Sequence, residues 1–530
     1  MRQVKLLVLL MLLLSPAAVP CASAQGLQVV RGGCLPGVDG GDAATRGASQ
    51  LSRRQLPTPS NDWDSEKIYR QLVILFSFSD TDFSRENPKE WYHQILNEPG
   101  YNEGKGPGCM ADYFREQSGG LFNLQFDVYG PYQVSSKAQP YDKPNENTRN
   151  YGIDRMVEAT KQMIAENPDL NFKVYDWNGD GTIEQVIYIF AGIGGNQATK
   201  ESFGHIWPNT SNFTAVTAPD GTVIRNYSSS AELWVGGASC GIGTICHEYS
   251  HSLGLPDIYP TNSTSAYYSV CDEWDLMDGG NFTNGGWCPP NYTAQEKMLL
   301  GWATATELTE AIAITDMAPQ SRGGEIYSIH HTDNEYLLLE NRQQVGWDLG
   351  VPGKGLVIYH VDYNKSKWGG NSVNAEDKHF RFQLVHADNM DYNHWEEVKP
   401  YGKVNQYQNE RAMNNWHLSS SPFPWSTDST TFVNSELTDK STPATVMFNE
   451  VVVEVNDTTY KSKLLSKPLT NIQMAADGTV SFYFGGYVPT AVQTVTVGPQ
   501  QGARLYNLQG QRVSQPGKGI YIRNGKKFRY

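Results

Sequence analysis

Apolar and polar residues follow two different patterns along this chain, and the first pattern predicts strands that alternate with helices. A continuous apolar run of strand length, residues 72–78, begins the ordered part. Runs with helical spacing then alternate with further strand-like runs. The predicted helices are residues 110–117 and 153–166, and the predicted further strands are residues 121–128 and 185–191. This alternation predicts an α/β (α+β) domain over residues 66–307.

The second pattern begins at about Leu308, where helical spacing fades and short β-type runs separated by turns take over. These runs are residues 336–339, 355–360, 380–385, 451–455 and 480–484. They predict a β-sandwich-like region over residues 308–486. Residues 487–530 form a short tail, in which we expect two or three strands joined by Gly-rich turns.

The amino terminus has the features of a secretory signal. Arg2 and Lys5 precede an apolar run, and small residues precede a predicted cleavage between Ala24 and Gln25. Cys21 would suit a lipid anchor, but Pro20 stands where such signals carry a small residue, so cleavage is favoured. Residues 25–65 are polar and rich in Gly, Ser, Pro and Arg, which predicts a pro-segment or extended arm. We therefore expect an exported protein, secreted or held in the periplasm or at the cell surface.

Composition and charge narrow the classes of partner. Hydrophobic residues make up 39% of the chain, which is enough for packed cores, and the formal net charge at pH 7 is −14. This acidity argues against nucleic acid as a partner, and no stretch after the signal is long and apolar enough to span a membrane. Six cysteines follow the signal, and the last four, Cys240, Cys246, Cys271 and Cys288, lie near one motif. In an exported protein this predicts one or two disulfides there.

That motif is HEYSH, residues 247–251. Histidines at positions i and i+4 project from one face of a helix, so both imidazoles of His247 and His251 can bind one Zn²⁺. Glu248 lies beside the first histidine without being a ligand, where it can act as a general base. Gly254 follows as the residue that ends the helix. The alternative is an ordinary helix with two surface histidines.

The third zinc ligand follows from the turn after the helix. A left-handed Gly254 would turn the chain sharply and bring Asp257 back to the metal. Glu273, at a later point of the chain, is the competing candidate. In the segment WDLMDGG, Met277 is predicted to lie in a turn beneath the metal site, with generic core packing as the alternative.

These residues predict hydrolysis of peptide bonds. Zinc lowers the pKa of a bound water, and Glu248 takes its proton as the water attacks the carbonyl and then passes the proton to the leaving amine. The expected partners are protein or peptide substrates, and the sequence leaves the oligomeric state open. His205, Tyr259, Tyr267 and Tyr268 could assist the oxyanion, although each could equally be structural.

Two further segments carry candidate chemistry. Oxygen-bearing side chains stand at the alternate positions Asp176, Asn178 and Asp180, with glycine for a sharp turn and Glu184 to close the loop, as in a calcium loop. The alternative is a polar hairpin. Cys34 lies in the predicted pro-segment, where its thiolate could cover the open zinc position and keep a precursor latent. In the alternative, Cys34 pairs with Cys109 or is free.

Several segments together resemble the immune inhibitor A family of secreted bacterial zinc metallopeptidases. They are HEYSHSLGLPD, WDLMDGG, QEKMLLGW, ADYFREQSGGLFNLQFDVYGPY, GHIWP, and LLLENRQ followed by GKGLVIYHVD. The resemblance implies a metzincin-like endopeptidase domain with a β-rich companion domain, catalytic zinc and stabilising calcium. It implies His247, His251 and Asp257 as ligands, Glu248 as the base and Met277 as the turn residue.

One residue departs from the family pattern. Asp278 stands where that pattern has a small residue, and its carboxylate could tune the site or point outward.

The tail resembles carboxy-terminal segments of exported Bacteroidales proteins, which would imply sorting or surface attachment, and a plain β-module is the alternative. A non-catalytic surface protein that binds carbohydrate or protein on a retained peptidase fold is the alternative function.

Overall fold

The computed structural model divides the chain into two compact units, Met1–Tyr487 and Val488–Tyr530. The structure describes residues 63–140, 148–197, 201–261, 270–376, 379–390, 418–426, 433–488, 505–507, 512–513, 520–523 and 526–529. The predicted signal, Cys21, Cys34 and most of the predicted pro-segment lie outside these ranges. None of the helices within the described ranges has the length and apolar content that crossing a bilayer requires.

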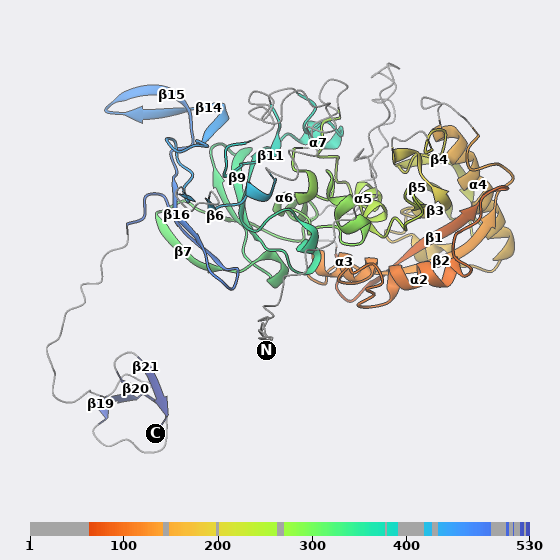
Figure 1. Cartoon of the computed structure of the whole chain (residues 1–530), viewed down its shortest axis with the longest axis horizontal. Helices are drawn as coiled ribbons and strands as arrows, with labels where there is room; N and C mark the ends of the chain where they lie inside the picture. The colour runs from red at the N-terminus through yellow and green to blue at the C-terminus, as the bar shows by residue number, and fades with distance from the viewer. Residues whose placement is uncertain are drawn as a thin grey trace, which may run out of the picture. The chain divides into compact units, whose positions relative to one another are not determined.

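A five-stranded sheet forms the first half of the first unit (Figure 1). Its central strands run parallel, and β4 pairs antiparallel with β5 at one edge. The strands, in spatial order, are β2 (Asn123–Gln133), β1 (Ile68–Ser77), β3 (Val186–Ile193), β5 (Val223–Leu233) and β4 (Thr210–Thr217). The predicted strands at residues 72–78, 121–128 and 185–191 are confirmed as β1, β2 and β3.

Both faces of this sheet are covered, which explains the uninterrupted apolar run of residues 72–76 within β1. Val73 and Leu75 pack into a core with helices α2 (Pro88–Asn97) and α3 (Met110–Gln117). Leu72 and Ile74 face a second core with helix α4 (Thr148–Glu166). Side chains alternate between the faces of a strand, so a strand buried on both sides shows no polar positions. The predicted helices at residues 110–117 and 153–166 are confirmed as α3 and α4.

The second half of the first unit is β-rich, as predicted. A five-stranded sheet faces a three-stranded sheet, and apolar side chains from both fill the space between them. The five-stranded sheet contains, in order, β11 (Phe382–Leu384), β10 (Gly355–Asp362), β9 (Glu335–Arg342), β8 (Tyr327–His330) and β6 (Thr306–Glu307). The three-stranded sheet contains β16 (Leu469–Met474), β17 (Val480–Phe484) and β7 (Ile312–Met317).

The two halves share one core. Leu337 and Ile358, on β9 and β10, face the three-stranded sheet. Their neighbours Leu338 and Tyr359 belong to the same apolar cluster as α3 and the residues around the histidine motif. The β-rich region is therefore packed on the first half through an apolar interface, and the division into compact units places no boundary between them.

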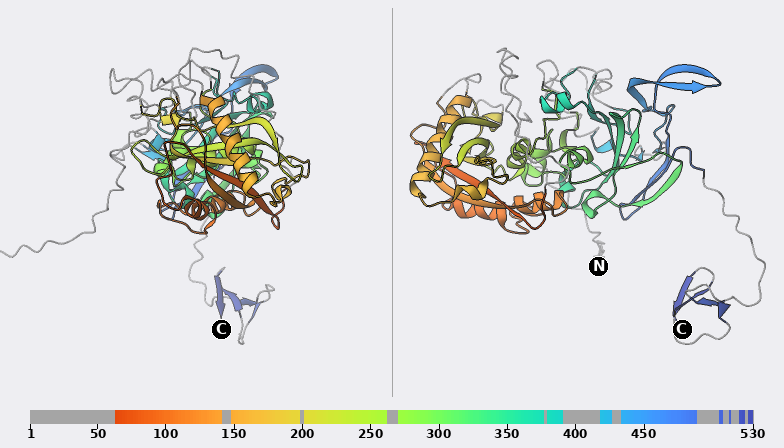
Figure 2. Two further views of the ribbon diagram at one scale, coloured as in Figure 1. Left: turned by 90° about the vertical axis from the view of Figure 1, so that its right-hand side faces the viewer. Right: turned by 180° about the vertical axis from the view of Figure 1, so that it is seen from behind.

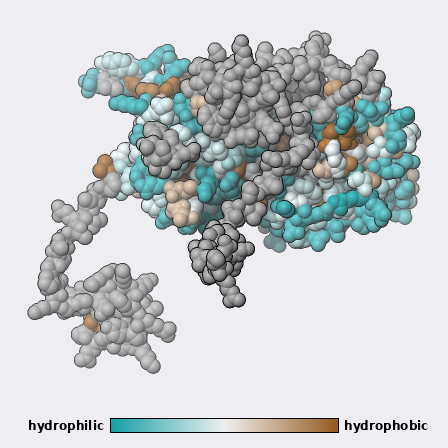
Figure 3. Space-filling view, in the orientation of Figure 1, coloured by the Kyte–Doolittle hydropathy of each residue, from teal (hydrophilic) through white to brown (hydrophobic). Residues whose placement is uncertain are grey.

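The smaller elements complete the first unit. The short strands β12 (Trp425–Ser426) and β13 (Val433–Asn434) pair, as do β14 (Val446–Val455) and β15 (Thr458–Leu464). The β14–β15 hairpin stands out from the β-rich end of the first unit, most clearly in the right-hand view of Figure 2. Its exposed apolar side chains include Val452 and Tyr460. In the space-filling view, the surface of this hairpin carries hydrophobic patches among hydrophilic residues (Figure 3).

The second unit is described by four short strands. They form one antiparallel sheet in the order β19 (Arg512–Val513), β18 (Leu505–Asn507), β20 (Ile520–Arg523) and β21 (Lys526–Arg529). The tail therefore contains β-structure, with four strands among its described residues where the sequence predicts two or three.

The prediction of disulfides near the motif is wrong for the cysteines that the structure describes. All five are buried free thiols: Cys109, Cys240, Cys246, Cys271 and Cys288. They occupy separate positions in the packed interior and act as small apolar residues. Two also make hydrogen bonds: Cys109 accepts from the backbone N–H of Asp112 at the start of α3, and Cys288 donates to the carbonyl of Trp347.

Candidate metal centre

Helix α5 (Gly243–Ser252) carries the histidine motif against the shared core. Ile242, Ile245, Cys246 and Tyr249 recur at helical spacing and pack into that core. The same packing buries the polar residues between them, and His247 and Glu248 are 0% and 1% exposed. Burial of such side chains is costly unless they have partners, so their contacts indicate what the site is built for.

Each histidine is oriented by a hydrogen bond from its Nδ1–H to a backbone carbonyl. His247 Nδ1 lies 2.8 Å from the carbonyl oxygen of Leu276, and His251 Nδ1 lies 2.9 Å from that of Leu255. This arrangement fixes the tautomer and leaves both Nε2 lone pairs for another partner.

The end of α5 brings a carboxylate to these nitrogens. Gly254 has φ +100°, its N–H donates to the carbonyl of His251, and Leu255 N–H donates to that of Ser250. This is a Schellman motif, which reverses the chain direction. Asp257 Oδ1 then lies 3.4 Å from His247 Nε2 and 3.1 Å from His251 Nε2.

The three side chains fit a zinc ion. Their ligand atoms lie within 4.8 Å of one another, and Glu273 is not part of this group within the described ranges. His247 Nε2 and Asp257 Oδ1 are buried and form no hydrogen bond with another residue that the structure describes. Two imidazole nitrogens and one carboxylate oxygen converge here, which is a donor set that suits zinc and would leave a fourth position for water or substrate.

The charges in this group depend on one another. Burial lowers the pKa of His247, but the carboxylates of Asp257 and Glu248 outweigh burial and raise this pKa to about 9. Burial would raise the pKa of Asp257, but the two histidines hold it well below its usual value. Asp257 and Glu248 therefore supply the negative charge that favours a cation beside the imidazoles.

Glu248 has a partner on the edge strand of the sheet. The hydroxyl oxygen Oγ1 of Thr210, the first residue of β4, lies 2.8 Å from Glu248 Oε2 and 2.6 Å from the carbonyl oxygen of Glu248. The hydroxyl donates to these acceptors, and Thr210 is itself fixed by pairing with Ser228 of β5. The carboxylate is thus held on the side of α5 that faces β4.

The turn around Met277 makes hydrogen bonds with both segments of the site, the helix that carries His247 and the chain that follows Asp257. The carbonyl of Met277 accepts from Ile258 N–H at 2.9 Å, one residue after Asp257, and the adjacent carbonyl of Leu276 orients His247. Met277 itself is fully buried in the shared core. Asp278 points inward, since its Oδ2 accepts three backbone N–H groups, from residues 270, 271 and 272. Burial raises its pKa to about 7.

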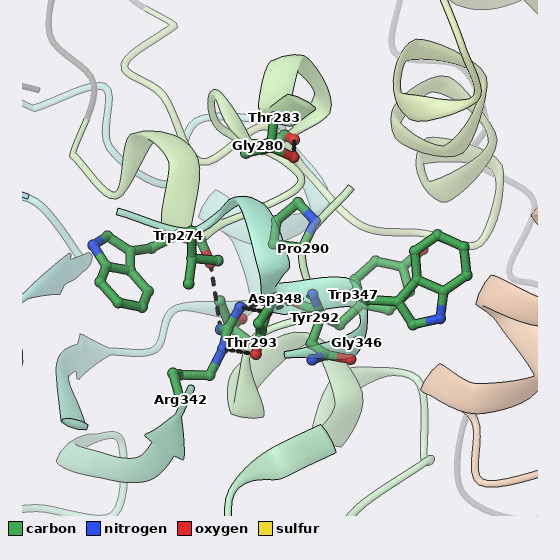
Figure 4. A network of polar contacts seen from close by, with 12 residues as sticks. Trp274, Gly280, Thr283, Pro290, Tyr292, Thr293, Arg342, Gly346, Trp347 and Asp348 are labelled. Carbon is green, nitrogen blue, oxygen red and sulfur yellow. Dashed lines mark hydrogen bonds and ion pairs between the residues drawn. The ribbon is translucent and has the colours of Figure 1, made fainter. Parts of the chain in front are cut away.

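A buried ion pair connects this turn to the β-rich region (Figure 4). Arg342 on β9 binds both carboxylate oxygens of Asp348, at 2.7 and 2.5 Å, and donates to the carbonyl of Trp274 at 3.4 Å. Arg342 and Asp348 are both 0% exposed. Such a two-point contact fixes the position of both partners. The backbone before Met277 is therefore tied to the five-stranded sheet of the β-rich region.

The predicted assisting residues lie in different environments. His205 is half-buried, and burial lowers its pKa. Tyr259 is buried just after Asp257. Tyr267 and Tyr268 lie outside the described residues.

The predicted calcium loop folds around its own backbone. Asp176 accepts from the N–H groups of residues 179, 180 and 181, and Glu184 Oε2 accepts from Trp177 N–H. Asn178 and Asp180 accept in the same way from N–H groups two residues further on. Gly179 and Gly181 have positive φ, as the tight turns require.

Comparison with known proteins points to the same part of the chain. Residues 75–301 match the family described as "Immune inhibitor A peptidase M6, catalytic domain". The M6 match covers the histidine motif, Asp257 and the turn around Met277, and it ends before the β-rich region.

Two curated relatives align with a little under half of this chain. The chain is 23% identical to "Pre-pro-metalloprotease PrtV" of Vibrio cholerae over 268 residues, which are 46% of this chain and 28% of that protein. It is 26% identical to "Immune inhibitor A" of Bacillus thuringiensis subsp. alesti over 300 residues, 47% of this chain and 42% of that protein. The chain thus spans less than half the length of these curated relatives.

Sequence reasoning missed two residues that contact the site. Thr210 lies 38 residues before Glu248 and Asn371 lies 114 residues after Asp257, and neither belongs to a motif. Only the pairing of β4 with β5, and the packing of the β-rich region on the first half, bring them to Glu248 and Asp257.

Proposed function

We propose that this protein is an exported zinc-dependent endopeptidase that hydrolyses peptide bonds in proteins. The observation that carries the proposal is the convergence of His247 Nε2, His251 Nε2 and Asp257 Oδ1 beside Glu248. The M6 match and the names of both relatives support a metallopeptidase.

The chemistry divides between the metal and the chain. Zinc held by His247, His251 and Asp257 would supply a Lewis acid that activates water and polarises the substrate carbonyl. Glu248 receives the proton of the attacking water and delivers it to the amine of the leaving group. Thr210 keeps the Glu248 carboxylate in place for both proton transfers. Because Glu248 and His247 are buried, few bulk waters can reach the Glu248 carboxylate and exchange protons with it.

Casein cleavage with two variants tests this function. We expect one equivalent of zinc in the purified protein, loss of cleavage when a chelator removes it, and recovery when zinc is restored. Glu248→Ala should bind zinc and lose cleavage, whereas Glu307→Ala, an exposed glutamate of β6, should match the parent. A zinc-replete parent that does not cleave would favour the non-catalytic binding protein, and an active Glu248→Ala variant would remove Glu248 from the mechanism.

We also propose that the chain is made as a precursor with a cleaved signal. The support is the charged and apolar pattern of residues 1–24 and the polar segment that follows. N-terminal sequencing of the mature protein should begin at Gln25 or at a later processing site. A Cys34→Ala precursor should be active before processing if the thiolate covers the metal, and an equally latent variant would refute that role.

Calcium is proposed for the loop between Asp176 and Glu184. Four side chains with oxygen donors and two glycines with positive φ support it. Added Ca²⁺ should raise the melting temperature of the zinc-loaded parent and have no effect on Asp180→Ala. Equal shifts in both proteins would place calcium elsewhere.

A further inference from the structure

A loop of the β-rich region reaches the carboxylate of Asp257. Asn371 follows helix α7 (Lys365–Gly369) and adopts φ +54°, a left-handed conformation that asparagine tolerates better than most residues. Although 114 residues separate them in sequence, Asn371 Nδ2 donates to Asp257 Oδ2 at 2.6 Å. The loop thus contacts a member of the metal group directly.

Both ends of the Asn371 amide are used. The backbone N–H of Asp257 donates to Asn371 Oδ1 at 2.6 Å, and Thr261 Oγ1 donates to the Asn371 carbonyl at 2.9 Å. An asparagine can accept from an N–H group and donate to a carboxylate at the same time, whereas an ionised aspartate can only accept. The contact therefore requires a neutral amide at position 371.

The loop that carries Asn371 is in turn fixed to the five-stranded sheet of the β-rich region. Asn374 is fully buried, and its Nδ2 donates to the carbonyls of Ile258 and Phe382 at 2.7 and 2.8 Å. Its Oδ1 accepts from Phe382 N–H at 3.1 Å, on strand β11. Residues 257 and 258 are therefore held to the β-rich region by two asparagines.

These contacts divide the two oxygens of Asp257 between two tasks. Oδ2 accepts the amide of Asn371, and Oδ1 faces both histidine nitrogens at 3.1–3.4 Å. We propose that Asn371 is a positioning residue that directs Asp257 to bind the metal through Oδ1 alone, so that the β-rich region completes the metal centre. This inference rests on the zinc site of the proposed function, and Asn371 lies outside the residues of the M6 match.

The expected size of the effect follows from the role of such contacts. Hydrogen bonds to metal ligands typically change metal affinity or activity by about 10–100-fold when they are removed. Asn371→Gly removes the amide and keeps the positive φ without strain, so we expect zinc affinity to fall by about 10–100-fold. Asn371→Asp keeps the shape but sets a carboxylate oxygen against Asp257 Oδ2, so its affinity should fall at least as far.

The test measures zinc affinity of the full-length protein by competition with a chromophoric chelator. Asn364→Ala is the matched control, because Asn364 accepts from Ser366 and Lys367 N–H at the start of α7 and, among the described residues, makes no hydrogen bond to Asp257. The control should bind zinc like the parent, even if α7 is less stable. Thermal unfolding of the metal-free proteins shows whether each variant is folded.

The outcomes separate this inference from the proposed function. A parent that binds zinc and depends on Glu248, together with an Asn371→Gly variant of unchanged zinc affinity, would overturn the inference alone. Equal losses in Asn371→Gly and Asn364→Ala would also overturn it, because they would reflect general destabilisation of the loop. A parent that binds no zinc would overturn the proposed function itself.

Discussion

Replacing Thr210 by valine should lower turnover and leave zinc binding intact. The substitution keeps the branched shape of the side chain and removes the hydroxyl that contacts Glu248 Oε2 at 2.8 Å. Hydrogen bonds to charged groups contribute about 1.5–3 kcal/mol. One hydroxyl proton serves two acceptors here, since the Glu248 carbonyl oxygen is also within 2.6 Å, so the lower end applies.

A loss of about 1.5 kcal/mol corresponds to an approximately tenfold lower kcat. Since Thr210 makes no hydrogen bond to His247, His251 or Asp257 in the part of the chain that the structure describes, KM and zinc affinity should stay close to those of the parent. Steady-state kinetics on a fluorogenic peptide, with zinc content measured on the same samples, would show this. Thr210→Ser keeps the hydroxyl and should restore most of the turnover.

A double-mutant cycle distinguishes a role through Glu248 from a structural one. In a Glu248→Asp background the carboxylate is withdrawn from Thr210, so the added Thr210→Val substitution should have little further effect. Three results would refute the reasoning: an unchanged kcat in Thr210→Val, a serine variant as impaired as the valine variant, or full additivity in the cycle.

Three other substitutions test the surrounding structure. Arg342→Met strands two buried carboxylates, Glu340 and Asp348, and should cost at least about 3–5 kcal/mol in urea unfolding. Lys461→Met, at an exposed ion pair, should cost less than about 1 kcal/mol. Gly254→Ala forces a side chain into φ +100°, so we expect a loss of about 1–2 kcal/mol and weaker zinc binding, measured by unfolding and chelator competition. For Glu335, burial alone would raise the pKa, but His360 and two backbone N–H groups lower it from 4.5 to about 2. Its contribution is therefore present above pH 4.5 and lost as the pH falls towards 2, and Glu335→Gln should lack this part of the acid dependence in unfolding experiments.

The fold was predictable where local pattern and burial agree. The uninterrupted apolar run of β1 and the helical spacing of α3 and α4 give these elements directly. The order of the strands depends on which faces pack together over long sequence separations, which a single sequence does not encode locally. The disulfide prediction failed for a related reason: cysteines close in sequence, such as Cys240 and Cys246, lie in different cores.

The same distinction applies to the site. The spacing of His247, Glu248 and His251 is a property of one helix, and the turn at Gly254 extends it to Asp257. Thr210 and Asn371 reach these residues only through tertiary packing, so no local signal marks them. The groups that could react were visible in the sequence, and the groups that hold them in position were not.

The position of Asn371 also bears on where the catalytic part of the chain ends. The M6 match stops at residue 301, yet the core that buries α5 also contains Leu338, Val357, Tyr359 and Phe382 from the β-rich region. A chain ending near residue 307 would expose this apolar surface and lose the amide that holds Asp257. The group of His247, His251 and Asp257 and the β-rich region therefore form one structural unit, in which the second part supplies both the packing behind the site and the contact to Asp257.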